Sequence, residues 1–305
     1  MRTLFTMSAV ATLAFSVGAW AEPIYGVSDA SSSQALFMFD SANAAGSTVI
    51  GTITGLAADQ VIRDIDFRPA DGLLYAITTT ADFPTSARLY TIDLGTGAAT
   101  AVGTGFTLTG NTSSRFSVDF NPVVDRLRVV TGDGHNYRVN PIDGTLVAQD
   151  TSLSAGTDTP QMSGIAYSNS FAGATQTTLY GYDYFTDTVG TIGGLNGAPN
   201  SPNGGLYTAI GGSGVVTFSA AAGMDISGAT GMAYFAADDN DSPTAASELF
   251  SINLGTGALT RVGNLPVAAI GISVMTPVPE PASWGLMVLG LGAMGGFAAR
   301  RRRVG

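Results

Sequence analysis

The sequence of 305 residues contains no cysteine and no lysine, and its only histidine is His135. Without cysteine the chain forms no disulfides and has no thiol chemistry. A serine hydrolase needs a base beside its nucleophile, yet His135 lies in an apparent tight turn at 131–136 and no serine has the surroundings of a nucleophile elbow. Zinc is also disfavoured, because it prefers nitrogen and sulfur ligands. We therefore predict a protein that is not an enzyme, without assigned catalytic residues, and with His135 as a polar loop residue.

Positive charge is scarce outside the two ends of the chain. Five of the 13 arginines are Arg2 and Arg300–Arg303, whereas all 23 acids lie between Glu22 and Glu280. The intervening segment thus holds 8 arginines against 23 acids, a formal charge of −15. This balance argues against nucleic acid as a partner, because phosphate contacts need a basic face.

The N-terminus has the layout of a secretory signal. Arg2 is followed by the largely apolar run 4–17, and Ala19 and Ala21 are small residues at the two positions that signal peptidase reads. We expect residues 1–21 to be a signal peptide that is cleaved after Ala21. The alternative is a retained membrane helix, for which the apolar run is short.

The C-terminus contains a second apolar run. Residues 282–299 carry no charge and reach the lower limit of a membrane-spanning helix. Arginines follow at once, and positive charge beside a span marks its cytoplasmic side. Composition alone predicts a chain that is exported and then stopped in the inner membrane, as an ordinary tail anchor would be.

Val278 and the motif Pro279, Glu280 and Pro281 precede this apolar run, and the cluster Arg300, Arg301, Arg302 and Arg303 follows it. The order of these three features resembles the PEP-CTERM sorting signal of exopolysaccharide-producing Gram-negative bacteria. In that family an exosortase, an integral membrane enzyme, recognises the signal and the tail is removed. The resemblance implies a sorting signal at 277–305, a transmembrane segment at 282–299, and only transient anchoring in the inner membrane.

A repeat organises the region 22–276. LYTIDLGTGAATAVG at 89–103 returns as LFSINLGTGALTRVG at 249–263. Each copy alternates apolar and polar residues around Gly-Thr-Gly, which is typical of a β-hairpin. A second strand–turn–strand element, such as IDFRP at 65–69, precedes most copies and completes a unit of four strands.

Repeated four-stranded units predict an all-β, β-propeller-like fold. Segments from both ends, 24–53 and 268–274, would complete one more blade and close the ring, which removes open sheet edges. Five blades are favoured, with six blades or an irregular β-sandwich as alternatives. The four continuous units are expected at 62–103, 115–150, 162–217 and 223–263.

Several of these segments resemble a bacterial secreted family known as domain of unknown function 4394. They include DIDFRPADGLLYAI, LYTIDLGTGAATAVG, FSVDFNPVVDRLRVV and GDGHNYRVNPIDG, and the similarity extends over most of 24–275. The resemblance supports the domain boundaries and implies no activity and no catalytic residues.

Aspartates recur beside the predicted inner strands. Asp64, Asp66 and Asp119 are candidates to converge near a central channel, where paired carboxylates could act on polysaccharide. The structural alternative is that each hydrogen-bonds turn amides. Four arginines are near enough in sequence to pair with these acids: Arg63, Arg68, Arg126 and Arg128.

Calcium is the only cofactor that the sequence suggests. Asp238, Asp239 and Asp241 supply hard oxygen ligands, although their spacing does not match an EF-hand and solvated acidic turns would look the same. Most tyrosines occupy alternating strand positions and are expected in the core. The dense aromatic cluster at 182–185 is the candidate for an exposed recognition loop.

Together these features predict an exported protein at the cell surface or in the extracellular matrix, with a non-enzymatic structural or binding role. The expected partners are signal peptidase, exosortase and exopolysaccharide or surface glycans. Two alternatives stay open: an extracellular polysaccharide-acting enzyme that uses carboxylates, and a periplasmic scaffold permanently tethered to the membrane.

Overall fold

The computed structural model describes residues 21–28, 33–80, 84–111, 113, 115–217, 222–238 and 246–275. Ala19, the motif at 279–281, the arginines at 300–303 and the predicted span 282–299 therefore lie outside the described residues. Within them, no helix has the length and apolar character that crossing a bilayer requires.

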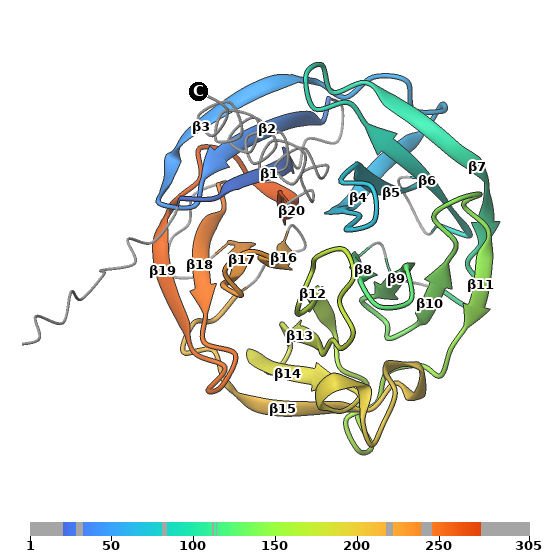
Figure 1. The fold of residues 1–305 in the computed structure, drawn as a ribbon, viewed down its shortest axis with the longest axis vertical. Coiled ribbons are helices and arrows are strands. Elements are labelled where there is room, and N and C mark those ends of the chain that lie inside the picture. The colour runs from blue at the N-terminus through green and yellow to red at the C-terminus, as the bar shows by residue number, and fades with distance from the viewer. Residues whose placement is uncertain are drawn as a thin grey trace, which may run out of the picture.

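Five four-stranded antiparallel sheets form a ring, so the fold is a five-bladed β-propeller (Figure 1). This confirms the favoured prediction and excludes six blades and the sandwich. Blade 1 contains β20 (Ala269–Val274), β1 (Pro23–Ser28), β2 (Ala35–Asp40) and β3 (Asn43–Thr52); blade 2 contains β4 (Gln60–Phe67), β5 (Leu74–Thr80), β6 (Ser86–Ile92) and β7 (Ala99–Thr107); blade 3 contains β8 (Phe116–Asn121), β9 (Arg126–Thr131), β10 (Asn136–Val139) and β11 (Leu146–Gln149); blade 4 contains β12 (Met162–Tyr167), β13 (Leu179–Asp183), β14 (Thr188–Ile192) and β15 (Tyr207–Gly212); blade 5 contains β16 (Gly223–Ile226), β17 (Ala233–Ala237), β18 (Glu248–Ile252) and β19 (Leu259–Asn264).

Blade 1 is assembled from both ends of the propeller, as the sequence predicted. Its inner strand β20 pairs antiparallel with β1, with Ile24 opposite Val274 and Gly26 opposite Ile272. The last strand of the domain is thereby hydrogen-bonded to the first. The pairing of β1 with β20 therefore closes the ring of blades.

The repeated hairpins owe their shape to the Gly-Thr-Gly turn. In the copy between β6 and β7, the Asp93 side chain accepts a hydrogen bond from the Gly95 N–H at 3.1 Å, and Gly97 has a φ of 77°. A Cβ at Gly97 would lie 3.1 Å from the Gly51 carbonyl oxygen of blade 1. Gly257, in the second copy, also has a positive φ, of 81°. Both the turn and the close packing of the next blade therefore require glycine.

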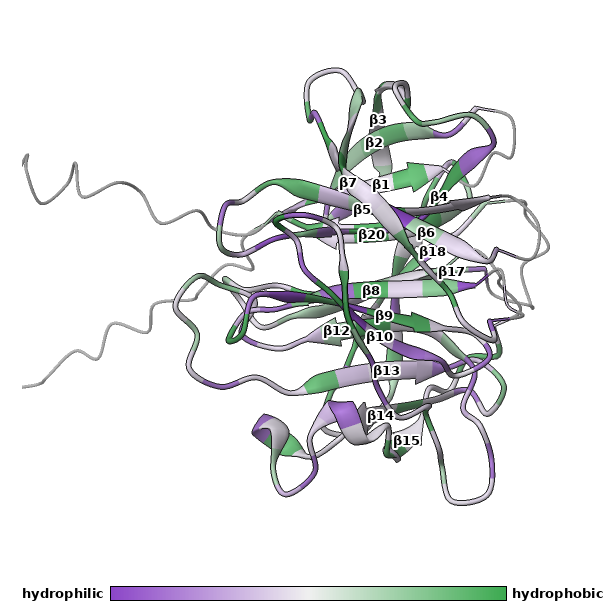
Figure 2. Ribbon diagram, turned by 90° about the vertical axis from the view of Figure 1, so that its right-hand side faces the viewer, coloured by the Kyte–Doolittle hydropathy of each residue, from purple (hydrophilic) through white to green (hydrophobic). Residues whose placement is uncertain are grey.

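The hydrophobic core lies between neighbouring blades. The inner and middle strands are almost wholly buried, whereas residues of the outer strands are mostly exposed or half-buried. Aromatic pairs bridge the blades: Tyr75 and Phe120 meet edge to face with ring centroids 5.1 Å apart, and Tyr182 stacks on Phe235 at 4.5 Å. Figure 2 shows hydrophobic segments along the strands. This arrangement places the five inner strands side by side around the axis.

Candidate functional site

The first candidate site lies where the inner strands meet. Asp66 on β4, Asp119 on β8 and Asp225 on β16 each place a carboxylate oxygen within 4.8 Å of the others. Their exposed fractions are only 2%, 1% and 3%. We call these three carboxylates the hub. The predicted convergence is thus observed for Asp66 and Asp119, and Asp225 joins them. Asp64 is not part of this group and accepts a hydrogen bond from Val118 N at 2.8 Å.

Each hub carboxylate also connects its own blade to the next one. It accepts a hydrogen bond from a backbone N–H on the neighbouring inner strand, where the strand edge would otherwise be unpaired. The aspartates therefore bond strand amides of the adjacent blade, not the turn amides that the sequence suggested. The bonds run from Phe120 N to Asp66 Oδ2 at 2.7 Å, from Tyr167 N to Asp119 Oδ1 at 3.0 Å, and from Val274 N to Asp225 Oδ2 at 2.6 Å.

Burial disfavours the charged form of these acids. It raises the pKa of Asp66 and of Asp119 well above the ordinary value, and the neighbouring hub carboxylates raise both further. The pKa of Asp225 is raised to about 6, again mainly by burial. No ion pair among the described residues involves a hub carboxylate.

The arginines that neighbour these acids in sequence pair elsewhere. Arg68 bonds to Asp71 and Asp125, and Arg128 bonds to Asp150. The pairing with hub acids that the sequence left open is therefore not formed by these two arginines.

The second candidate site is a cavity of about 370 Å³ between blades 3 and 4. We call it the arginine pocket. It gathers three of the eight arginines of the domain in an otherwise acidic protein. The lining residues are Asn121, Val124, Arg126, Arg128, Arg138, Val147, Tyr167, Ser201, Pro202 and Asn203.

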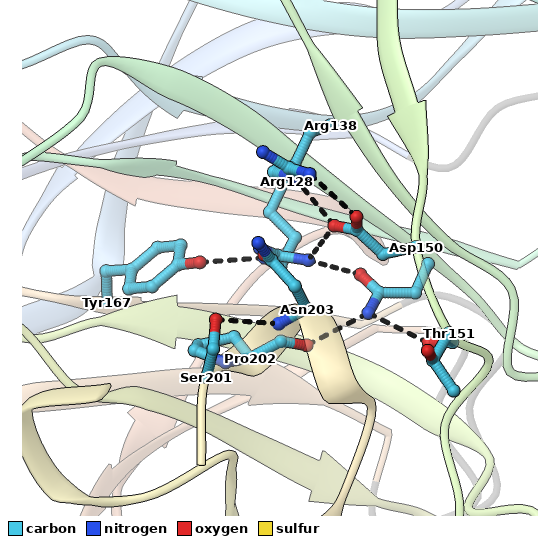
Figure 3. A network of polar contacts seen from close by, with 9 residues as sticks. Arg128, Arg138, Asp150, Thr151, Tyr167, Ser201, Pro202 and Asn203 are labelled. Atoms are coloured by element: carbon cyan, nitrogen blue, oxygen red, sulfur yellow. Dashed lines mark hydrogen bonds and ion pairs between the residues drawn. The ribbon is translucent and has the colours of Figure 1, made fainter. Parts of the chain in front are cut away.

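Arg128 is the centre of a polar network at this pocket (Figure 3). Its side chain is 3% exposed. Nε donates to the Tyr167 hydroxyl at 2.7 Å, and one terminal nitrogen donates to Asn203 Oδ1 at 2.6 Å. The other donates to Asn136 Oδ1 at 2.5 Å and lies 3.3 Å from Asp150 Oδ2. Because Asn203 belongs to the 3₁₀ turn η2 (Pro202–Gly204), the network fixes this turn of blade 4 against blade 3.

The pocket has more positive than negative charge. Arg138 holds Asp150 through two bonds, Nε to Oδ2 at 2.7 Å and a terminal nitrogen to Oδ1 at 2.8 Å. Arg126 has no acid partner among the described residues and donates only to the Asp125 carbonyl oxygen, at 2.7 Å. Two of the three guanidinium groups therefore share one carboxylate, Asp150, and Arg126 retains unused donors.

The other predicted site residues are dispersed. The ring of His135 stacks on Tyr137 with centroids 6.0 Å apart, and its Nδ1 lies 3.2 Å from Asp133 Oδ1. Asp238 directly follows β17, whereas Asp239 and Asp241 lie outside the described residues, so the calcium prediction there stays a prediction.

The aromatic cluster at 182–185 is divided by the fold. Tyr182 is fully buried and Tyr184 partly buried, and only Phe185, 72% exposed, presents an aromatic ring to solvent. Phe185 borders a second cavity of about 500 Å³ with Asp183, Tyr207 and residues 157–161. The recognition-loop prediction therefore concerns one side chain.

Sequence reasoning missed Asp225 and the whole arginine pocket. A signal for Asp225 existed, because GMDISG at 223–228 is a degenerate copy of the inner-strand element. The pocket residues are spread from 121 to 203 and form no motif, so they come together only through blade packing.

A profile of the family described as Domain of unknown function (DUF4394) matches residues 35–273, and a profile of the PEP-CTERM protein-sorting motif matches 277–303. The sorting motif implies an exported protein that is sorted by an exosortase. No curated protein matches the chain in sequence.

Solved structures resemble this chain at low sequence identity. A GH43 glycoside hydrolase with an engineered active site has a TM-score of 0.51 and 10% identity, covering 86% of this chain but 55% of its own. TolB from Acinetobacter baumannii gives 0.44 and 10%, with 84% and 67% covered. A putative 6-phosphogluconolactonase from Bacteroides uniformis gives 0.41 and 16%, with 81% and 83% covered. At these identities the likeness concerns the fold alone.

Proposed function

For this chain, which belongs to the family described as Domain of unknown function (DUF4394), we propose the role of an exported, exosortase-sorted propeller that binds an acidic glycan at the cell surface or in the extracellular matrix. It binds through the arginine pocket and releases the glycan unchanged.

The observation that carries this proposal is the unpaired guanidinium of Arg126 in the pocket wall. Arginine presents a planar fork of donors that matches a carboxylate in a bidentate way. A carboxylate of the ligand would accept from Arg126 as Asp150 already accepts from Arg138. The acidic remainder of the domain would repel the same group, so the pocket is where a polyanionic chain can be held.

A glycan fits the polar character of the lining. The Ser201 hydroxyl, the Asn121 and Asn203 amides and the Tyr167 hydroxyl border the same cavity as the arginines. Such groups hydrogen-bond sugar hydroxyls, and about 300–1,000 Å³ is the usual volume of a small-ligand site.

The pocket favours binding over turnover. Arginine cannot act as a general base, because it is not deprotonated in proteins. The lining residues include no carboxylate, and Asp150, behind them, is held by Arg128 and Arg138. The polysaccharide-acting enzyme that the sequence left open would need Asp66 or Asp119, and both are buried and bonded to backbone amides.

Delivery is part of the proposal. The signal peptide would be removed after Ala21, and exosortase would remove the C-terminal tail after transient anchoring in the inner membrane. The competing scaffold, tethered permanently by residues 282–299, would keep the arginines at 300–303. The sorting motif supports the first route.

The test is calorimetric titration of the protein with oligosaccharides that contain uronic acids. Replacing Arg126 by glutamine removes a charge-assisted bond of about 1.5–3 kcal/mol and should weaken binding by roughly 10–100-fold. Arg88→Gln is the matched control, because Arg88 lies on blade 2 away from the pocket. Equal affinity of the wild type and Arg126→Gln would refute the assignment. If the wild type instead cleaves the glycan and Asp119→Asn abolishes this cleavage, the protein is the polysaccharide-acting enzyme and the binding proposal is wrong.

A further inference from the structure

We propose that the hub is a site for one divalent cation of the calcium type, with Asp66, Asp119 and Asp225 as its protein ligands. The site would be structural, at the axis of the propeller. It is separate from the arginine pocket and does not depend on the glycan proposal.

The spacing of the carboxylates fits a calcium coordination sphere. One oxygen from each aspartate lies within 4.8 Å of the other two. Calcium binds oxygen at about 2.3–2.6 Å, so two ligands on opposite sides of the ion are about 4.6–5.2 Å apart. Magnesium demands nearly ideal octahedral geometry and usually keeps several waters, which three buried protein carboxylates suit less well.

An unpartnered oxygen at the hub points to a missing ligand. Asp119 Oδ2 is buried and has no hydrogen-bond partner, whereas Asp119 Oδ1 accepts from Tyr167 N. Leaving a buried polar oxygen without a partner costs about 1–3 kcal/mol, and more when the group is charged. Two further buried hydroxyl oxygens on the inner strands also lack partners, Ser117 Oγ on β8 and Ser163 Oγ on β12. A cation on Asp119 Oδ2 would remove the largest of these penalties.

The Ser273 hydroxyl lies between two hub carboxylates and cannot donate a hydrogen bond to both. Ser273 Oγ accepts from Phe67 N at 3.1 Å and lies 2.8 Å from Asp66 Oδ1 and 2.9 Å from Asp225 Oδ2. A hydroxyl has one proton and can donate it to only one of the two carboxylates. When Ser273 donates to Asp225, Asp66 Oδ1 has no donor, and no described ion pair gives it a positive partner. A divalent cation would satisfy both.

The position of the site defines what the ion would do. Its ligands come from blades 2, 3 and 5, which are three separate sheets. An ion held by all three blades would tie their inner strands together at the axis. Binding only to the folded state raises stability, so calcium should raise the melting temperature.

The experiment is to strip the purified protein with chelator, return it to calcium by equilibrium dialysis, and measure bound metal and melting temperature. We expect about one calcium per chain and a higher melting temperature than in chelator. Asp119→Asn should lower the bound calcium at least tenfold and abolish the calcium-dependent shift.

Two controls locate the ion. Asp93→Asn changes an acid in a turn where the equivalent repeat already has Asn253, and should bind calcium as the wild type does. Asp239→Asn combined with Asp241→Asn removes the alternative ligands near Asp238 and should also leave binding unchanged. The proposal is overturned if the wild type binds no calcium, if Asp119→Asn retains it, or if the double variant loses it. Should Asp119→Asn not fold, the wild type and the double variant still decide between these outcomes.

Discussion

Replacing Arg128 by methionine should lower the free energy of unfolding by about 3 kcal/mol. The guanidinium is buried and donates to Tyr167, Asn136 and Asn203 at 2.5–2.7 Å. Methionine keeps much of the volume but leaves these three acceptors without their donor, and an unsatisfied buried group costs about 1–3 kcal/mol.

Two effects limit the loss. Asp150 keeps both bonds from Arg138, so no buried carboxylate is left without a cation. Removing the buried charge also removes its desolvation cost. The sum therefore falls near the lower end of the range, at about 3 kcal/mol. For a domain of this size, that corresponds to a melting temperature lower by about 6–12 °C.

The assay is urea unfolding followed by tyrosine fluorescence, with calorimetry as a second measure. Arg88→Met is the control, because Arg88 bonds to the Gly103 carbonyl and lies over the Tyr90 ring in a partly exposed position. This control should lose less than about 1 kcal/mol. If Arg128→Met is no less stable than Arg88→Met, the network in Figure 3 does not hold blades 3 and 4 together.

Three further predictions follow from the hub, the hairpin turn and the sorting signal. Burial raises the pKa of Asp225 from 3.8 to about 6, so in the presence of chelator its protonated form contributes about 3 kcal/mol to the free energy of unfolding below about pH 4. This contribution is lost as the pH rises to 6, and urea unfolding that shows a gain in stability over the same range would contradict the prediction. Gly97→Ala should cost about 1 kcal/mol or more, because alanine must adopt a φ of 77° only 3.1 Å from the Gly51 carbonyl oxygen, whereas a melting temperature equal to that of the wild type would show that the turn relaxes. Mass spectrometry of the mature protein should find a C-terminus that lacks residues 300–303, and an intact terminus would favour the permanent tether.

The blade architecture was predictable because the strands carry local signals. Alternation and the Gly-Thr-Gly turns at 89–103 and 249–263 specify hairpins without reference to the rest of the chain. The count of units, with one blade shared between the ends, followed from the order of the repeats. The radial arrangement of the units, which Figure 1 shows, is the part of the fold that depends on tertiary packing.

The sites were predictable only in part. Asp66 and Asp119 occupy equivalent positions in their inner strands, so a ring of blades must bring them to one axis. The partner of Arg128 was not predictable, because Asp150 is 22 residues away and Asn203 belongs to another blade. Pairing by proximity in sequence fails where side chains from adjacent blades compete for the same guanidinium.

The proposed function depends on an acidic ligand held by Arg126. The most direct measurement is a paired titration of the wild type with a uronic-acid oligosaccharide and with the same oligosaccharide after its carboxyl groups are reduced to alcohols. We expect binding that weakens at least tenfold on carboxyl reduction and that falls as salt is raised. Equal affinity for the two oligosaccharides, or binding of neither, would contradict the account.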